Sequence, residues 1–443
     1  MEQSEYKPFI QGVVDEINDK FLERDELARV LILCLFAQQN IFLFGKPGVG
    51  KTDIVKSVSS ILSDGRSWET LVNSETKIYS FFGDETISYK DRDLEKTIIG
   101  NEIVFLDEMF KAPAEPLNSL LPILNEKLYY SDGNAYPVPL IMAVGASNEM
   151  PEGEKIAPFD DRFVFRMEVL RIQDERNFHK FIRKEFVADR NVSLKISKED
   201  VKSVFHKSME IDGSAEFWRE FLVIKGRIIK SGIDISDRKL GRAMDVLRVS
   251  AFLNGRQELD YSDVFVLRNI AWVKLEHKKI INRILYGFAF SFPDVIDDRL
   301  QKADEEYKVL EANVNEWLFD FLTYNFRELD FNATLEFRFN TIVDTTVKSI
   351  LAEVDRVAGF YISIKNLKSR GDMIASMIED NIFVSEVKDI TYTSEVIERY
   401  ENKIAQLYKL NNDLIEWIES NRDFYEFQQN CLKRQVSGNS RER

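Results

Sequence analysis

Residues 41–52 read Ile41-Phe42-Leu43-Phe44-Gly45-Lys46-Pro47-Gly48-Val49-Gly50-Lys51-Thr52. The four apolar residues at the start are typical of a buried strand, and a helical apolar pattern follows the threonine. Between them stands the spacing G-x-x-x-x-G-K-[ST]. In the order strand, loop, helix, such glycines fold the backbone into a concave nest whose N–H groups point at phosphate oxygens. The helix start adds unpaired donors and the positive end of its dipole. The stretch therefore predicts a nucleotide site rather than an ordinary glycine-rich turn.

The predicted cofactors of this site are ATP and Mg²⁺. Lys51 would reach the β- and γ-phosphates, and the Thr52 hydroxyl would ligate Mg²⁺. The residues expected to contact the nucleotide are consecutive in the sequence: Gly45, Lys46, Pro47, Gly48, Val49, Gly50, Lys51, Thr52 and Asp53.

Polar side chains end two further apolar runs. The run 103–106 is followed by Asp107 and Glu108, about fifty residues after the phosphate loop. The run 141–147 is followed by Asn148. Since parallel strands open on a ligand crevice at their carboxyl ends, we expect these groups near the nucleotide. Asp107 would hold the Mg²⁺ shell through water, and Glu108 would act as general base. Asn148 would contact the γ-phosphate or position water, or would simply cap a turn.

Three arginines have two possible readings each. Arg162 and Arg166 lie four apart in an apolar frame and follow Asp160 and Asp161. Both form salt bridges with these aspartates, or one is an arginine finger aimed at a neighbouring subunit. Arg238 falls in the first turn of a helix capped by Ser236 or Asp237, where a cation meets the positive end of the dipole. Its position indicates a compensating ligand or acidic partner, or a plain surface residue.

Composition narrows the class of protein. The 443 residues carry a net charge of −15, which argues against a dominant duplex-binding face. The two cysteines, Cys34 and Cys431, form no metal spacing, and this suits a cytoplasmic, reducing location. No apolar run approaches the ~20 residues of a membrane span.

The order of motifs resembles the MoxR-type AAA+ ATPases, and within them the regulatory ATPase variant group. The specific part consists of IVFLDEMFKAP, LNEK, an aromatic hairpin signature, ASNEMP and DRF, at 103–113, 124–127, 129–136, 146–151 and 161–163. The resemblance covers residues 8–275. It implies an α/β AAA+ P-loop core, a parallel sheet with flanking helices, followed by an all-α lid.

The resemblance also implies roles for the residues named above. Lys51 and Thr52 would be Walker A, Asp107 and Glu108 Walker B, Asn148 sensor 1 and Arg238 sensor 2. Arg162 would be the trans-acting finger, with Arg166 as the alternative. Such proteins are usually hexameric rings that couple ATP hydrolysis to the remodelling of a protein partner. The partner is often a von Willebrand factor A domain protein.

The last 150 residues contain three heptad-like apolar seams. They predict long helices near 299–325, 340–368 and 393–427 that pack as a bundle. A β-rich stretch between the second and third helices indicates a small inserted lobe near 369–392. The predicted domains are accordingly a core (1–171), a lid (172–290), a helical arm with its lobe (291–435) and a disordered polar tail (436–443). The alternative for the arm is a buttress under the ring.

Two other function classes remain open from the sequence. A nucleic-acid motor would use the same insertions, but the predicted hairpin tip, Ser131-Asp132-Gly133-Asn134, is acidic and polar. A nucleotide switch without hydrolysis could dispense with Glu108 and with a finger. The leading hypothesis is an ATP hydrolase that remodels protein.

Overall fold

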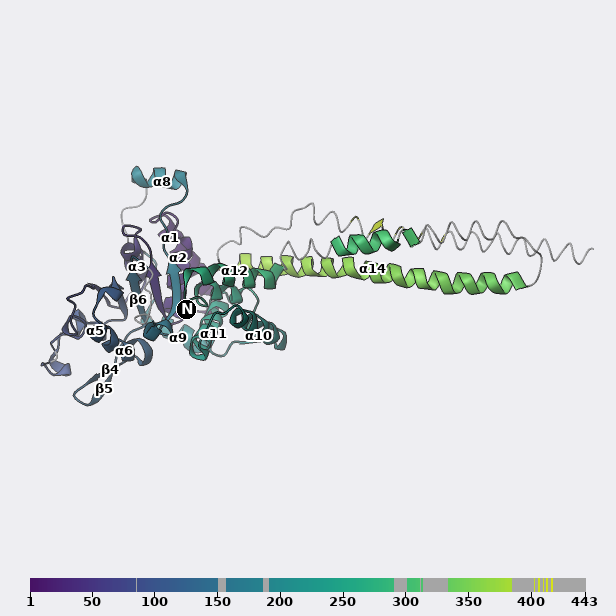
Figure 1. Ribbon diagram of the computed structural model, residues 1–443. Helices are drawn as coiled ribbons and strands as arrows, with labels where there is room; N and C mark the ends of the chain where they lie inside the picture. The colour runs from purple at the N-terminus through teal and green to yellow at the C-terminus, as the bar shows by residue number, and fades with distance from the viewer. Residues whose placement is uncertain are drawn as a thin grey trace, which may run out of the picture. The chain divides into compact units, whose positions relative to one another are not determined.

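The computed structural model of the chain describes residues 1–84, 86–149, 157–185, 191–290, 301–310, 312–313 and 334–384, with a few positions between 402 and 416. The chain divides into two compact units (Figure 1). Unit 1 comprises Met1–Ala289 and Met373–Val387. Unit 2 comprises Phe290–Asp372 and Lys388–Arg443.

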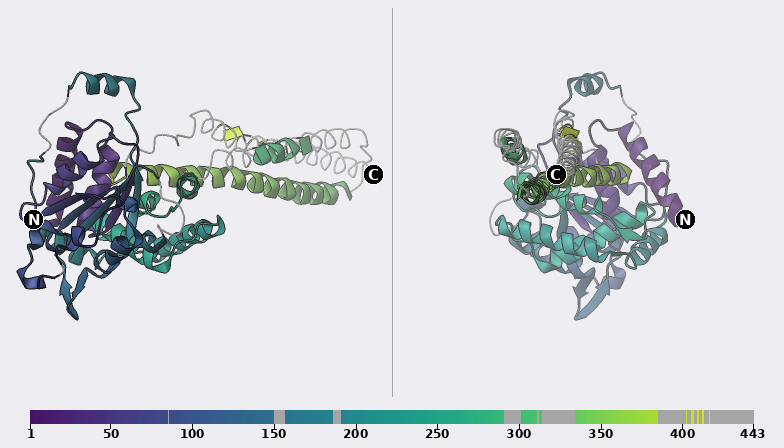
Figure 2. Two further views of the ribbon diagram at one scale, coloured as in Figure 1. Left: turned by 60° about the vertical axis from the view of Figure 1, so that its left-hand side comes forward. Right: turned by 90° about the vertical axis from the view of Figure 1, so that its right-hand side faces the viewer.

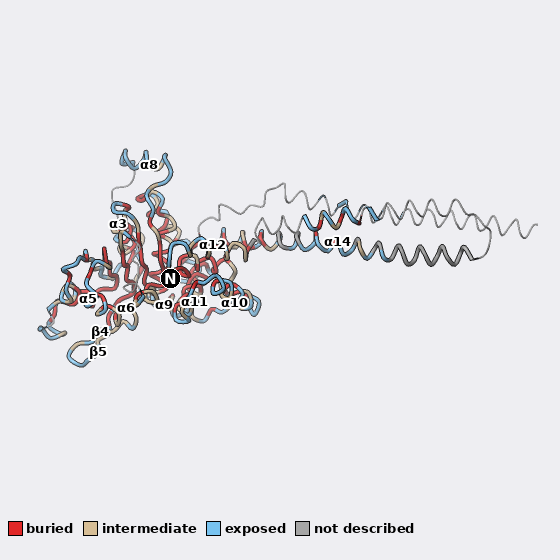
Figure 3. The backbone as a smooth tube through the Cα atoms, in the orientation of Figure 1, coloured by how far each residue is buried: buried red, intermediate tan, exposed pale blue. Residues whose placement is uncertain are grey.

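A five-stranded parallel sheet forms the centre of unit 1, in the order β2-β3-β6-β1-β7. Its strands are β1 (Asn40–Phe44), β2 (Ser67–Leu71), β3 (Ile103–Asp107), β6 (Met142–Ser147) and β7 (Phe163–Glu168). The three inner strands are buried along almost their whole length (Figure 3). Continuous burial is what apolar runs predict for a parallel sheet covered on both faces. The parallel-sheet core implied by the sequence is confirmed.

Helices of the first 160 residues surround this sheet. They are α1 (Gln3–Asn18), α2 (Asp25–Phe36), α3 (Lys51–Ser59), α4 (Tyr79–Phe82), α5 (Ala114–Ser119), α6 (Leu121–Glu126) and α7 (Ala157–Asp160). Short 3₁₀ segments are η1 (Tyr89–Asp91), η2 (Leu94–Lys96), η3 (Ile98–Gly100) and η4 (Met109–Lys111). Helix α2 packs against β1, and α3 packs against both α2 and β3. These contacts fix the start of α3, and with it the phosphate loop, against the sheet.

A hairpin of β4 (Leu128–Ser131) and β5 (Asn134–Pro137) projects from the sheet's helical cover (Figures 1 and 2). Its turn, Asp132-Gly133, has two positive φ angles, as the sequence signature predicts. Tyr136 of the hairpin stacks on Tyr89 of η1 with ring centroids 3.9 Å apart. Arg92 donates to the Tyr129 hydroxyl at 2.7 Å. The segment before β3 and the hairpin are thus joined by an aromatic stack.

The second half of unit 1 is mostly helical, which is the all-α lid that the sequence predicts. Its elements are α8 (Glu175–Ile182), α9 (Lys198–Ser208), α10 (Ala215–Lys230), α11 (Asp237–Leu253), η6 (Asp263–Asn269), α12 (Leu275–Phe290) and the short strands β8 (Asp212–Gly213) and β9 (Glu258–Leu259). Helix α11 packs against α9, η6, α1 and α2. Helix α8 stands away from the body of unit 1 (Figure 2).

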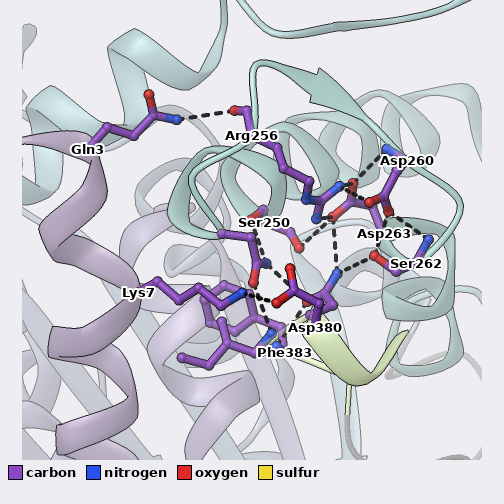
Figure 4. Close-up of polar contacts among 12 residues, drawn as sticks. Gln3, Lys7, Ser250, Arg256, Asp260, Ser262, Asp263, Asp380 and Phe383 are labelled. Atoms are coloured by element: carbon purple, nitrogen blue, oxygen red, sulfur yellow. Dashed lines mark hydrogen bonds and ion pairs between the residues drawn. The ribbon is translucent and has the colours of Figure 1, made fainter. Parts of the chain in front are cut away.

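A segment from near the end of the described chain completes unit 1 (Figure 4). Helix α14 (Thr334–Asp380) ends in this unit, and the turn 381–384 after it is buried throughout. Asn381 donates to Ser262 Oγ at 2.8 Å and accepts from Asn254 Nδ2 at 3.1 Å. Lys7 of α1 pairs with Asp380 at 2.7 Å. The N-terminal helix and the lid therefore both hold a segment that lies more than a hundred residues after the lid.

The predicted lobe near 369–392 is wrong over its described part. Residues 369–380 continue α14, and 381–384 form a turn rather than a strand. The β-rich composition of Ile382-Phe383-Val384 reflects burial against the lid, since these side chains are only 4–7% exposed. The remaining residues of the predicted lobe, 385–392, lie outside the described part of the chain.

Unit 2 contains part of the predicted helical seam. Residues 301–310 are helical, and Ala303, Tyr307 and Leu310 are buried there. On α14, Val357 and Tyr361 are buried, and the Tyr361 hydroxyl donates to Asp304 at 2.8 Å. These are the seam positions that the heptad pattern predicts for two of the three helices. The third seam, the register residue Asn411 and the tail 436–443 fall outside the described residues.

Candidate nucleotide site

The phosphate loop joins β1 to α3. Gly48 and Gly50 have φ of 79° and 82°, and Gly50 is the N-cap of α3. Such angles are strained for residues with a Cβ atom. Gly45 is required for another reason, because a Cβ there would lie 2.2 Å from the Val169 carbonyl oxygen. The loop therefore adopts the concave backbone that the sequence predicts.

Lys51 begins α3 and is almost fully buried. Its ammonium donates to the Gly45 carbonyl at 2.5 Å and to Asn148 Oδ1 at 3.1 Å. Burial lowers the pKa of Lys51, and the nearby Asp107 and Glu108 carboxylates act in the opposite direction. The structure thus brings the predicted Walker A lysine and sensor 1 amide into direct contact.

Asp107 and Glu108 lie at the carboxyl end of β3. Burial, followed by the adjacent Glu108 charge, raises the pKa of Asp107. Glu108 is only 6% exposed, and Lys111 approaches its carboxylate at 3.5 Å. Glu108 also has φ 56° and ψ 35°, a left-handed conformation that costs a residue with a Cβ about 1–3 kcal/mol. Strain held at this position aims the carboxylate and favours a functional role.

These residues line one cavity of about 770 Å³. The predicted residues on its wall are Pro47, Gly48, Val49, Gly50, Lys51, Thr52, Asp53, Asp107, Glu108 and Asn148. Gly45 and Lys46 belong to the same loop but contribute no wall. Thr52 and Asp107 supply the hydroxyl and carboxylate oxygens that Mg²⁺ prefers, so the donors present fit this metal. The loop's backbone donors and Lys51 fit a chain of phosphates.

Arg24 is a site residue that the sequence did not reveal. It lines the cavity and donates through Nη2 to the carbonyls of Val49 and Leu170, both at 2.9 Å, while its Nε reaches Val49 at 3.3 Å. It stands immediately before α2, where an arginine gives no pattern that indicates contact with a loop 25 residues later. Arg24 ties the phosphate loop to the end of β7.

Arg166 is placed inside its own subunit. It is 1% exposed, pairs with Asp160 and donates to the carbonyls of Trp272 and Val273. Burial lowers the pKa of Arg166 to about 10. A side chain held in this way cannot reach a neighbouring subunit, so the Arg166 alternative for the finger is wrong. The salt-bridge reading applies to this arginine.

Arg162 and Arg238 contribute no wall to the cavity of their own subunit. Arg162 donates to the Pro158 carbonyl at 2.7 Å, and its Nε finds no partner among the described residues. Arg238 is exposed in the first turn of α11, and Ser236 caps that helix as predicted. Both guanidinium groups depress the pKa of Arg242, which places the three arginines near one another.

Comparison with known proteins gives the family. A family model described as the MoxR domain in the MoxR-vWA-beta-propeller ternary systems matches residues 9–205, and a model of the AAA lid domain matches residues 219–285. Two uncharacterized proteins of Methanocaldococcus jannaschii are 32% and 31% identical over 307 residues. The matches span 66% and 67% of this chain and 81% and 79% of those proteins. The chain belongs to the MoxR family of AAA+ ATPases.

Other relatives agree with this assignment. The chaperone MoxR1 of Mycobacterium tuberculosis is 23% identical over 167 residues, 36% of this MoxR chain and 44% of MoxR1. A crystal structure from Cytophaga hutchinsonii, described as a candidate ATPase, has a TM-score of 0.53 at 18% identity. It covers 64% of this chain and 95% of its own, and shows the fold alone. Among the described residues of the MoxR chain, no helix is long and apolar enough to cross a membrane.

Proposed function

We propose that this MoxR chain hydrolyses Mg-ATP and uses the energy, as a hexameric ring, to remodel a partner protein. The observation that carries the hydrolytic part is the convergence of Lys51, Asp107, Glu108 and Asn148 on one cavity at the carboxyl edge of the sheet. Each of these groups comes from a different strand end or from the loop after β1. Their meeting is the arrangement that phosphoryl transfer to water requires.

The residues would divide the work of this reaction. Lys51 and the loop amides hold the phosphates, and Lys51 releases Asn148 to contact the γ-phosphate or the attacking water. Thr52 and Asp107 would hold Mg²⁺, which supplies charge neutralisation on the phosphates when it is bound. Glu108 accepts a proton from the water, because its carboxylate is buried beside the cavity and aimed by its backbone conformation.

Hydrolysis would require a second subunit. Arg162 and Arg238 lie together and neither lines its own cavity, so we place both against the nucleotide of a neighbour. A positive group supplied across an interface stabilises the charge of the transferring phosphoryl group. This arrangement makes assembly a condition of activity.

The partner would be a von Willebrand factor A domain protein. Support comes from the matching family model, whose description names MoxR-vWA-beta-propeller systems. The division of unit 1 into core and lid at residue 171 is also part of this proposal, as is a cytoplasmic location, which rests on cysteine usage alone.

Phosphate release from the full chain tests the chemistry. Glu108→Gln should bind Mg-ATP and stop turnover, since the amide keeps the shape but accepts no proton. Glu115→Gln, an exposed glutamate just beyond η4, is the matched control and should hydrolyse normally. Wild-type turnover in Glu108→Gln would contradict the role of Glu108.

Mixed rings test the assembly. Arg162→Ala should bind ATP yet hydrolyse it about 10³–10⁵-fold more slowly, the range known for arginine fingers. Addition of Lys51→Ala subunits should restore some activity, because a mixed ring pairs an intact cavity with an intact finger. No recovery in rings of verified mixed composition would exclude action across the interface.

A further inference from the structure

The loop that carries Arg162 is attached to the N-terminal turns of α11. The Asp161 carboxylate accepts from Ser236 Oγ at 2.7 Å, and the Asp161 carbonyl accepts from Arg242 at 2.9 Å. The neighbouring Asp160 carboxylate pairs with Lys239 at 3.5 Å and with Arg166. Every one of these lid residues belongs to the stretch that also presents Arg238, or packs directly under it.

The spacing on α11 explains why one helix can hold the loop so closely. Ser236, Lys239 and Arg242 recur every three residues, so they share one face of the helix. Lys239 is 2% exposed, whereas Arg238 points to solvent between them in the sequence. The helix therefore holds the loop on one face and presents a free cation beside it.

Arg242 makes a second contact that fixes a third element. Its other guanidinium nitrogen donates to Asn125 Oδ1 of α6 at 2.8 Å. A single side chain thus joins α11, the Arg162 loop and α6. Only a planar guanidinium, with donors pointing in several fixed directions, can bridge a carbonyl and an amide oxygen in this way.

The local charge indicates that this assembly awaits an anion. Burial lowers the pKa of Arg242, and repulsion from Arg238 and Arg162 lowers it further. Arg242 and Lys202 in turn repel Lys127, at the end of α6, where burial is the main cause of a pKa lowered to about 8. Gathering cations in this way costs free energy, and a phosphate group is the ligand that would repay it.

We propose that Arg242 is a positioning residue that locks Arg162 and Arg238 into one cationic unit, which engages the nucleotide phosphates of a neighbouring subunit. Arg242 contacts no nucleotide itself and acts by holding the Arg162 loop on the lid. The inference rests on the proposed function of Arg162 in a neighbouring site. It adds that the finger moves with the lid, so that displacement of α11 engages or withdraws both arginines together.

The test compares ATP hydrolysis by assembled full-length Arg242→Ala and Arg242→Lys with wild type. Loss of the bridge should lower kcat about 10–100-fold, as expected for a misplaced catalytic group, and leave the KM for ATP unchanged. Arg242→Lys should remain slow, because an ammonium keeps the charge but cannot bridge both oxygens. Arg248→Ala is the matched control on the same helix, since Arg248 donates to Ile211 and not to the loop. Full activity in Arg242→Ala or Arg242→Lys would overturn the proposal.

A double variant separates positioning from direct contact. Arg162→Ala with Arg242→Ala should be no slower than Arg162→Ala alone, because Arg242 acts through Arg162. Multiplicative losses would overturn the positioning role. If Arg242→Ala does not fold, Asn125→Ala removes one anchor of the same bridge and should give the same kcat loss in reduced measure. An inactive wild-type ring would refute the proposed function itself, and a fully active Arg162→Ala would refute the finger, before Arg242 is considered.

Discussion

Asn381 offers the sharpest test of the segment that completes unit 1. The side chain is 3% exposed and makes four hydrogen bonds, to Asn254, Ser262, Asp263 and the Phe383 amide. Asn381→Ala removes all four. The three side-chain partners keep other bonds, so each loss costs about 1 kcal/mol, whereas the buried Phe383 amide is orphaned at about 1–3 kcal/mol. The docked turn should lose about 3–5 kcal/mol.

Hydrogen exchange at Ile382 and Phe383 measures this loss where it occurs. Both amides are hydrogen-bonded only when the turn is docked, to Asn254 Oδ1 at 2.9 Å and to Asn381 Oδ1 at 3.0 Å. Ile382 keeps its partner in the variant, and about 3 kcal/mol corresponds to a roughly hundredfold fall in its protection. Asn134→Ala, at the exposed hairpin tip, is the control. Protection of Ile382 within about threefold of wild type would refute the reasoning.

Two further predictions concern residues beside the site. Arg24→Ala should weaken Mg-ATP binding about tenfold, because charge-assisted bonds of about 1.5–3 kcal/mol hold the Val49 carbonyl; a fluorescent-nucleotide titration measures this, and unchanged affinity would count against the tie. Lys127→Met should remove a pH dependence of stability. The folded pKa of Lys127, about 8, lies below its ordinary 10.5, so wild-type stability rises between these values as the folded state loses its proton first. The rise is at most about 1.4 kcal/mol per pH unit. Urea unfolding at pH 7 and pH 9.5 checks it, and an equal rise in the variant would show that Lys127 is not its source.

The sequence predicted the parts of the site that depend on strand ends. Lys51, Asp107, Glu108 and Asn148 each follow an apolar run, and parallel strands bring their carboxyl ends to one edge. No long-range information is needed for that inference. Element boundaries were less accurate: the predicted first helix, 8–22, begins at Gln3 in the structure, because the pair Glu2 and Glu5 caps it and Pro8 falls inside.

Residues whose role depends on tertiary contact could not be found in this way. Arg162 and Arg166 look equivalent in sequence, and only the packing of Trp272 and Val273 decides that Arg166 is internal. Similarly, Ile382-Phe383-Val384 has the composition of a strand, yet it is a turn whose apolar side chains fill the lid. In both cases a distant segment supplies the deciding contact.

The discontinuity of unit 1 has a consequence for biosynthesis. Met1–Ala289 leaves the ribosome long before Met373–Val387, with 83 residues, 290–372, between them. At about 5–20 residues per second, that interval is roughly 4–17 s. During these seconds Ser262 and Asn254 face an empty groove whose apolar floor awaits Ile382 and Phe383. A nascent chain of this protein thus passes through an obligatory incomplete state, in which the groove is open to chaperones or to the corresponding segment of another copy.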